Sequence, residues 1–146
     1  MKKFLSILTV VLGTTLSACA DDVVTRDINK LPENARKSLN ANFPQAKISY
    51  IKIDKELLRK DTFEAILTDG TKVEFDSEGN WKEVDCGRNA VPEAYIPTQI
   101  RTYLKANFPQ QKVTTIERER RKYKVELDNE LDAEFDLQGN FLRLDD

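Results

Sequence analysis

Carboxylates are the side chains of this sequence most suited to chemistry, because they recur at alternate positions of segments that read as strands. They are Glu64, Glu74, Asp76, Glu126, Asp132 and Glu134. Two such groups flanking a sugar bond would act as the acid and the base or nucleophile of a glycoside hydrolase. The competing interpretation is a solvated sheet face on which Lys72, Lys82 and Lys124 pair with these acids across strands. Nothing in the sequence predicts a cleft or a raised pKa, so we favour ion pairing and assign no catalytic residue.

The 146-residue chain contains no histidine. Histidine is the usual general base near neutral pH and the commonest metal ligand. Ser-His and Cys-His nucleophile systems are therefore excluded, and we expect a protein that is not an enzyme.

Cysteine chemistry is limited to two residues, Cys19 and Cys86. If Cys19 is removed or lipidated, no intramolecular disulfide can form and Cys86 is a single thiol. Two interpretations follow for Cys86: a reactive group, or a partly buried linker thiol without a role. We favour the second.

A short acidic motif, Asp-x-x-Gly-Asn, occurs at 76–80 and again at 136–140. Its oxygen atoms would suit calcium, but a calcium loop needs more alternating donors and a distal bidentate glutamate. Glycine at this position is typical of a hairpin turn that requires a left-handed residue. We therefore favour a turn, and we predict neither a metal nor a cofactor.

These motifs occur twice because the chain repeats itself. Residues 31–85 and 96–146 each run as an aliphatic residue, proline, a short helical pattern, Asn-Phe-Pro-Gln, strand-like segments, Glu-Phe-Asp-x-x-Gly-Asn and an aromatic residue. The two Asn-Phe-Pro-Gln motifs lie 65 residues apart and the two Glu-Phe-Asp motifs 60 apart, so the first copy carries five extra residues, within 54–61. A length change confined to a turn is typical of a duplicated folding unit.

Each copy predicts one helix followed by four antiparallel strands. The first helix has an apolar stripe with a spacing of four, formed by Leu31, Ala35, Leu39 and Phe43. Apolar and charged residues alternate in the segments that follow, which indicates a sheet with one packed and one solvated face. We therefore predict an α+β fold, a tandem repeat of α-β-β-β-β units whose strands form an antiparallel, curved eight-stranded sheet with the helices on one face.

The N-terminus reads as an export signal over residues 1–19, with a basic start and an apolar stretch too short to cross a membrane. Ala18-Cys19-Ala20 fits ordinary cleavage, whereas Leu16-Ser17-Ala18-Cys19 resembles a lipobox, in which Cys19 becomes the lipidated first residue. We favour the lipobox; the alternative is a cysteine that lies at the cleavage site by chance. The expected location is the periplasm or outer membrane, with a lipid anchor at Cys19 and a tether over residues 20–30.

Charge argues against nucleic acid as a partner. Removing Lys2 and Lys3 with the signal leaves 21 basic residues against 25 acidic ones, whereas nucleic-acid-binding domains usually carry a basic patch.

The two repeats, 31–85 and 96–146, are joined by a linker at 86–95.

A lipobox-like signal, followed twice by proline, a short helix, Phe-Pro and strands ending in Glu-Phe-Asp-x-x-Gly-Asn, resembles the PepSY-like exported proteins of Bacteroides-type bacteria. The resemblance covers about the whole mature chain. It implies a fold similar to that of β-lactamase-inhibitor protein, itself a tandem repeat of a helix with a four-stranded sheet. It also implies a binding or inhibitory module of the cell envelope, because the inhibitor relatives grip an enzyme with the open sheet face and its loops. It does not imply that β-lactamase is the target.

We predict a non-catalytic binding module that engages an unidentified envelope or extracellular protein. The contact would use the open sheet face and the 54–61 loop, and the module could act as an inhibitor of its partner. The expected partner-binding residues are Leu57, Leu58, Glu64, Lys72, Glu74, Trp81, Lys124, Glu126, Asp132 and Glu134. Trp81 would either pack at the edge of the core or point outward as an interface anchor. The alternatives are a small-molecule or peptide carrier with a pocket between helices and sheet, and a carboxylate-based enzyme acting on glycans.

Overall fold

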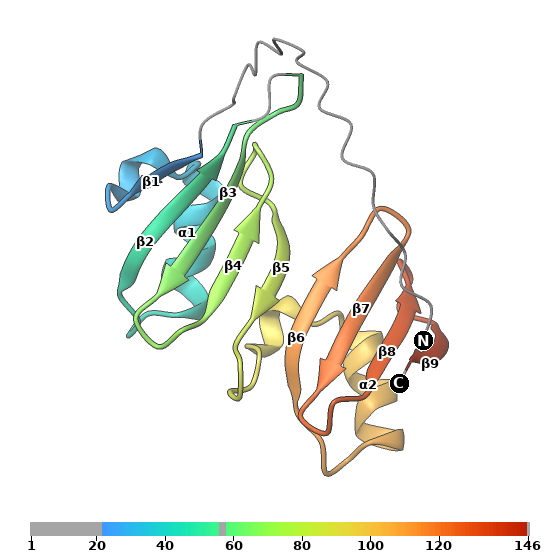
Figure 1. Ribbon diagram of the computed structural model, residues 1–146. Helices are drawn as coiled ribbons and strands as arrows, with labels where there is room; N and C mark the ends of the chain where they lie inside the picture. Colours follow the sequence, from blue (N-terminus) through green and yellow to red (C-terminus); the bar gives the residue numbers. More distant parts are fainter. Residues whose placement is uncertain (1–21, 56–57, 146) are drawn as a thin grey trace, which may run out of the picture.

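The computed structural model describes residues 22–55 and 58–145, which form one nine-stranded sheet with two α-helices and two short 3-10 helices (Figure 1). Both α-helices lie behind the sheet in this view. The export signal and Cys19 lie outside the described residues. Neither α-helix in the described part of the chain has the length and apolar content needed to cross a bilayer.

The strands follow the chain in order, and each is antiparallel to its neighbours. The first part comprises β1 (Val23–Thr25), η1 (Ile28–Lys30), α1 (Glu33–Asn42), β2 (Ile48–Asp54), β3 (Thr62–Leu67), β4 (Lys72–Phe75) and β5 (Trp81–Asp85). The second comprises η2 (Glu93–Tyr95), α2 (Thr98–Asn107), β6 (Val113–Arg118), β7 (Lys122–Leu127), β8 (Asp132–Asp136) and β9 (Phe141–Asp145).

The predicted α+β class and the tandem arrangement are confirmed, with one more strand than the predicted eight. The extra strand is β1, whose residues the sequence placed in the 20–30 tether. It pairs with β2, Val23 opposite Ile53 and Thr25 opposite Ile51. Three residues are too few to show an alternating pattern, but their backbone groups cover an edge of β2 that would otherwise be open.

The helices begin and end as their prolines require. Pro32 and Pro97 are the N-caps, a position that needs no backbone N–H from the residue. At the other end the Phe43 N–H donates to the Leu39 carbonyl at 2.8 Å, just before Pro44 stops the helix. Each helix turns its apolar stripe to the sheet, and the stripe residues Ala35, Leu39, Ile100 and Leu104 are buried.

The two repeats join through β5 and β6 into one continuous sheet. Val84 lies opposite Ile116, and both side chains are fully buried. On the first repeat, β1 takes the equivalent place, since Thr25 pairs with Ile51, the residue 65 positions before Ile116. β1 therefore pairs along the edge of β2 in the same way as β5 pairs along the edge of β6.

Candidate functional site

The sheet face opposite the helices carries a row of charged residues in direct cross-strand register. From β2 to β9 the row runs Lys52, Glu64, Glu74, Glu83, Glu117, Lys124, Glu134 and Arg143. Its centre is therefore four successive glutamates, on β3 to β6. Like charges placed directly opposite each other destabilise a sheet, so this arrangement is costly in the free protein.

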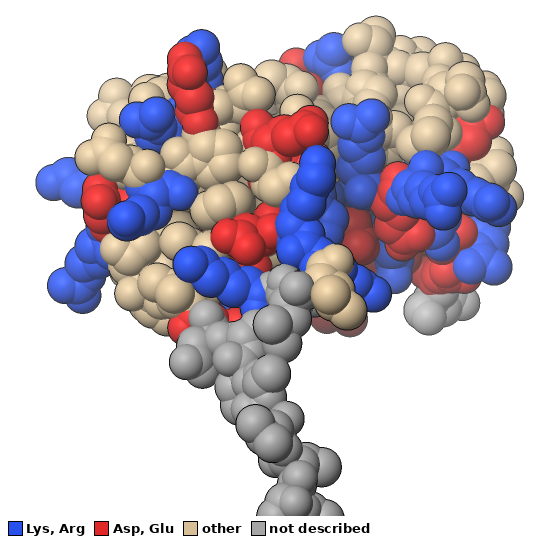
Figure 2. Space-filling view, turned by 90° about the horizontal axis from the view of Figure 1, so that it is seen from above, with Lys and Arg blue, Asp and Glu red and all other residues tan. Residues whose placement is uncertain are grey.

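A second row runs beside the first and is also acidic. It consists of Tyr50, Ile66, Lys72, Asp85, Thr115, Glu126, Asp132 and Asp145. The two rows together make up the face, and it carries four of the predicted partner-binding acids. Glu126 is exposed, whereas Glu64, Glu74 and Asp132 are half-buried. The rim formed by the hairpin tips differs, since acidic and basic side chains are interspersed there (Figure 2).

Lysines neutralise part of the face, as the sequence predicted. Nζ–carboxylate distances are 2.9 Å for Lys82–Glu74, 2.8 Å for Lys124–Asp132 and 3.5 Å for Lys72–Glu83. All these lysines are partly exposed, and such pairs contribute about 0–1 kcal/mol each. They leave the face with a surplus of acids.

The surplus concentrates where the repeats meet. Glu117 borders a shallow hollow of about 220 Å³ together with Glu83 and Asp85. Burial, with the nearby charges of Glu83 and Glu119, raises the pKa of Glu117. A raised pKa beside a second carboxylate is the feature that the glycan-enzyme alternative requires. Here burial is the largest cause of the raised pKa and the neighbouring carboxylates add to it, and Glu83 is already paired with Lys72.

Glu134 has a different environment from the other acids of the face. Its side chain is 7% exposed and lies under two cations, 2.7 Å from Lys122 Nζ and 2.9 Å from Arg143 Nε. Hydrogen bonds from Arg143 and Lys122 lower its pKa to about 2. Arg143 and Lys122, rather than the predicted Glu134, therefore face the solvent at this place.

Trp81 packs at the edge of the core, the first of the two predicted arrangements. Its ring meets Tyr95 edge-on at 5.6 Å and Tyr123 at 6.4 Å. A register shift between β4 and β5, next to the Phe75–Trp81 pair, turns the side chain toward the helices. Trp81 therefore does not point outward as an interface anchor.

The tip of the 54–61 loop carries an apolar side chain in solvent. Leu58 is 99% exposed and is therefore accessible to a partner, although a single exposed leucine is common on protein surfaces. Leu57, the other half of the predicted pair, lies outside the described residues. Glu83, Glu117 and Arg143 were not predicted from the sequence. Glu83 and Glu117 come together only through the β5–β6 pair, and Arg143 joins the row through its register with Glu134 on β8.

The two Asp-x-x-Gly-Asn motifs are turns. Asp76 Oδ1 accepts the N–H groups of Glu78 and Asn80 at 2.9 Å, and its Oδ2 accepts Asn80 Nδ2 at 3.1 Å. Asp136 makes the same three bonds in the second repeat. Both carboxylates are thus occupied by donors, and the described residues hold no cluster of three or more metal-binding side chains.

Glycine is required in the first of these turns for two reasons. Gly79 has φ +83°, and a Cβ there would lie 2.7 Å from the backbone nitrogen of Ala35 at the start of α1. The turn therefore fixes the strands against the helix, which is a structural role.

Cys86 is 4% exposed, and burial raises the pKa of its thiol. A buried, protonated thiol is a poor nucleophile. The structure therefore favours the unreactive interpretation of this residue.

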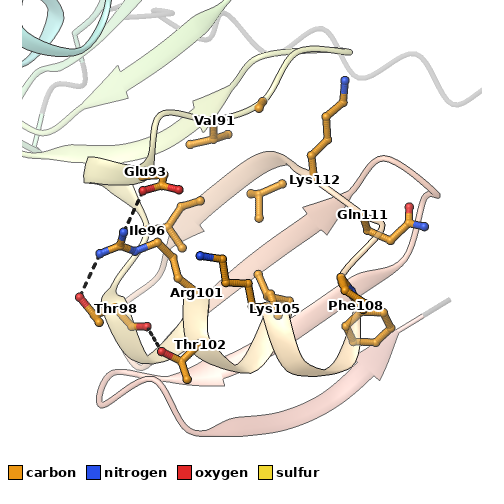
Figure 3. A pocket seen from close by; sticks show the side chains of 14 residues that line it. Val91, Glu93, Ile96, Thr98, Arg101, Thr102, Lys105, Phe108, Gln111 and Lys112 are labelled. Atoms are coloured by element: carbon orange, nitrogen blue, oxygen red, sulfur yellow. Dashed lines mark hydrogen bonds and ion pairs between the residues drawn. The ribbon is translucent and has the colours of Figure 1, made fainter.

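A groove of about 380 Å³ lies on the helix side, between the 86–95 linker, α2 and the start of β6 (Figure 3). Its apolar lining comprises Val91, Ile96, Leu104, Phe108 and Val113. Glu93 and Arg101 lie at one end, joined by an ion pair of 3.0 Å, and Lys105 projects between them and Phe108. The equivalent groove of the first repeat is smaller, about 230 Å³, with Asn40 in the place of Lys105.

Comparison with known proteins gives one family. The family described as beta-lactamase-inhibitor-like and PepSY-like matches residues 19–60 and 61–143. Among curated proteins, none matches the chain.

Three solved structures are similar over almost their whole length. A periplasmic protein of unknown function from Bacteroides vulgatus has 45% identity and a TM-score of 0.83, covering 86% of this chain and 100% of its own. A protein of Bacteroides thetaiotaomicron, provisionally described as calcium-regulated and periplasmic, has 37% identity and a TM-score of 0.81, covering 86% and 97%. A periplasmic DUF2874 protein of Bacteroides vulgatus has 35% identity and a TM-score of 0.81, covering 87% and 98%. These descriptions support export of this chain.

Proposed function

The chain belongs to the PepSY-like family of beta-lactamase-inhibitor-like proteins, and we propose that it is a non-catalytic binding module of the cell envelope. Its binding surface is the open sheet face, and its partner is a protein that presents a lysine- and arginine-rich surface. If the surface that the partner presents includes its active site, binding would inhibit that partner.

The observation that carries the proposal is the run of opposed glutamates, Glu64, Glu74, Glu83 and Glu117. A cross-strand pair is worth roughly 0.2–1 kcal/mol, and like charges reverse its sign. The outer half of the same row, Lys124, Glu134 and Arg143, alternates in sign and avoids this cost. A basic partner would relieve the repulsion, and complementary charge would give both specificity and a fast encounter.

The hairpin tip adds an apolar contact at the rim of this face. Leu58 belongs to the five-residue insertion that distinguishes the first repeat from the second, so it is not needed for the fold. Leu58 would add apolar contact area at the edge of a surface that is otherwise charged. Trp81 and Glu134 are not part of the proposed contact, because one packs inward and the other is covered by cations.

The test is capture of partners from envelope extract. A face variant carries Glu74→Gln, Glu83→Gln and Glu117→Gln, and a control removes three acids away from the sheet face and the 54–61 loop with Glu33→Gln, Glu93→Gln and Glu130→Gln. We expect a protein that the wild type and the control both recover and the face variant loses. Equal recovery by all three chains would remove the sheet face from the account. Leu58→Asp, compared with the wild type, tests the loop in the same way.

A second candidate function is transport of a small molecule or peptide, which the 380 Å³ groove favours. Its volume lies at the low end of the range of roughly 300–1,000 Å³ typical of ligand pockets. A fluorescent apolar probe would report on it, and Thr102→Trp should fill the groove and abolish the signal. No difference between wild type and Thr102→Trp would exclude this site.

Anchoring at Cys19 is part of the proposed localisation. The periplasmic relatives support export but do not bear on lipidation. Radiolabelled palmitate should be incorporated by the wild type and not by Cys19→Ser; incorporation by neither would indicate ordinary cleavage.

A further inference from the structure

Most large exposed apolar side chains of the described residues gather at the two ends of the sheet. Val23, Val24, Ile28 and Tyr50 lie at the β1 end, and Phe141, Leu142 and Leu144 lie on β9. The exceptions are Leu58, at a hairpin tip, and Leu137, which borders a hollow together with Trp81 and Arg118. β1 and β9 are the outermost strands on opposite sides of the molecule (Figure 1). Apolar surface that clusters at an open sheet edge usually marks an interaction site.

β9 is the end with the stronger pattern. It is five residues long, and three of them are apolar. Edge strands of monomeric proteins are commonly protected by proline, charged side chains, bulges or shortness. β9 has neither proline nor lysine; its charged residues are Arg143 and Asp145, and its pairing with β8 contains one register shift. Within residues 22–55 and 58–145, no strand pairs with its outer edge.

The internal repeat shows what an additional strand would bury. Leu144 lies opposite Ala133, as Val84 lies opposite Val73 in the first repeat. Val84 is fully buried, because β6 follows β5 in the sheet, whereas Leu144 is 43% exposed. The β5–β6 pair thus supplies a model for a further strand beside β9.

The sequence of β9 is self-complementary in one antiparallel register. If two copies of β9 pair about a two-fold axis through Leu144, the two Leu144 side chains face each other on the helix side. Arg143 of each copy then faces Asp145 of the other copy on the open face. Arg143 Nη2 lies 3.3 Å from Asp145 Oδ2 of its own copy, and the side chains are 61% and 41% exposed, so the dimer exchanges this pair for the same pair between copies. A register centred on Arg143 would instead oppose two arginines, which is unfavourable.

We propose that β9 is a dimerisation edge, through which two copies of this chain join their sheets antiparallel with Leu144 at the centre. The arrangement closes on itself, because a two-fold contact uses the same edge in both copies and leaves no β9 edge open. It leaves the glutamates at the centre of each sheet free and places two open faces side by side. A partner with two basic sites would then bind both faces with increased avidity.

The register is tested by disulfide trapping in the full exported chain with Cys19→Ser and Cys86→Ala, which removes the natural thiols. Leu144→Cys places two thiols directly opposite each other, at a separation that a disulfide accepts after slight adjustment. We expect Leu144→Cys to form a covalent dimer under mild oxidation at least tenfold faster than Leu142→Cys or Leu58→Cys. Equal rates at all three positions would mean random collision and would overturn the proposal.

Association itself is tested by sedimentation of the chain without the natural thiols from micromolar to near-millimolar concentration. We expect a reversible dimer, lost in Leu144→Lys and weakened in Asp145→Lys, with Leu58→Lys as the matched control that still dimerises. Asp145→Lys leaves the core untouched, so a monomer in that variant cannot be ascribed to misfolding. A wild-type chain that stays monomeric throughout, or a dimer unaffected by both β9 variants, would contradict the proposal.

Discussion

Glu83 on β5 lies directly opposite Glu117 on β6, at the strand pair that joins the two repeats. Neither residue belongs to the motifs that the repeats share, and each is an ordinary solvent-facing residue of its own repeat. Their opposition arises only from the register in which the repeats meet. It makes the junction the most acidic part of the face and the centre of the proposed binding surface.

Removing one of these charges should stabilise the free protein. Because burial and the neighbouring acids raise the pKa of Glu117, the folded state disfavours its charged form, and Glu117→Gln should raise the free energy of unfolding at pH 7 by about 0.2–1 kcal/mol. The gain should disappear at a pH below the unfolded pKa, where the glutamate is protonated in both states. Urea unfolding at pH 7 and pH 3 measures both values. A destabilised variant at pH 7 would show that Glu117 is not under repulsion.

Glu134 should behave in the opposite way. Its pKa falls from an ordinary value of 4.5 to about 2, so its charge stabilises the fold at any pH above the unfolded value. That contribution should decline as the pH falls from about 4.5 toward 2. Glu134→Gln should therefore lower the urea midpoint at pH 7 and lose most of its effect near pH 2. A midpoint difference independent of pH would mean that the loss reflects packing alone.

The glycines of two hairpins form a matched pair. Gly70 and Gly79 both have φ near +85°, at +88° and +83°, but a Cβ on Gly70 meets nothing within 4 Å, whereas one on Gly79 meets the α1 backbone. Gly70→Ala should cost about 1–2 kcal/mol for the left-handed conformation alone, and Gly79→Ala should cost clearly more. Thermal unfolding of the two variants gives the comparison. Equal losses would show that the turn is not pressed against the helix.

Calcium should have no effect on stability, although one relative is described as calcium-regulated. The carboxylates of Asp76 and Asp136 accept N–H donors that hold the turns, and the described residues contain no group of three or more side chains placed to hold a metal ion. Thermal unfolding should be the same with millimolar calcium as with a chelator. A saturable rise in the unfolding temperature that Asp136→Asn removes would overturn this assignment.

Much of the fold could be predicted from the sequence, because local patterns determine it. The duplicated Phe-Pro and Glu-Phe-Asp motifs, the spacing of Ala35 and Leu39, and the alternation in β3 and β8 are each set within a few residues. β1 was missed because three residues at an edge carry too little pattern to distinguish a strand from a tether.

The candidate site was harder to predict, because it depends on long-range packing. Tyr95 shows why: the linker residue fills the space beside Trp81 that Tyr103 fills beside Phe141 in the second repeat. Its hydroxyl lies 2.8 Å from Ser38, the residue 65 positions before Tyr103. The first repeat thus uses an aromatic ring from the linker to pack against Trp81. No pattern within either repeat indicates such a contact.

The most direct test of the central claim is photo-cross-linking in cells. A photoreactive amino acid replaces Thr115, which borders the acidic hollow between the repeats, or Thr102, an exposed residue of α2 on the helix side, as the control. The account predicts a covalent protein adduct at Thr115 that is absent at Thr102 and is lost when Glu74, Glu83 and Glu117 are changed to glutamine. Adducts at Thr102 alone, or at Thr115 regardless of the three glutamates, would contradict it.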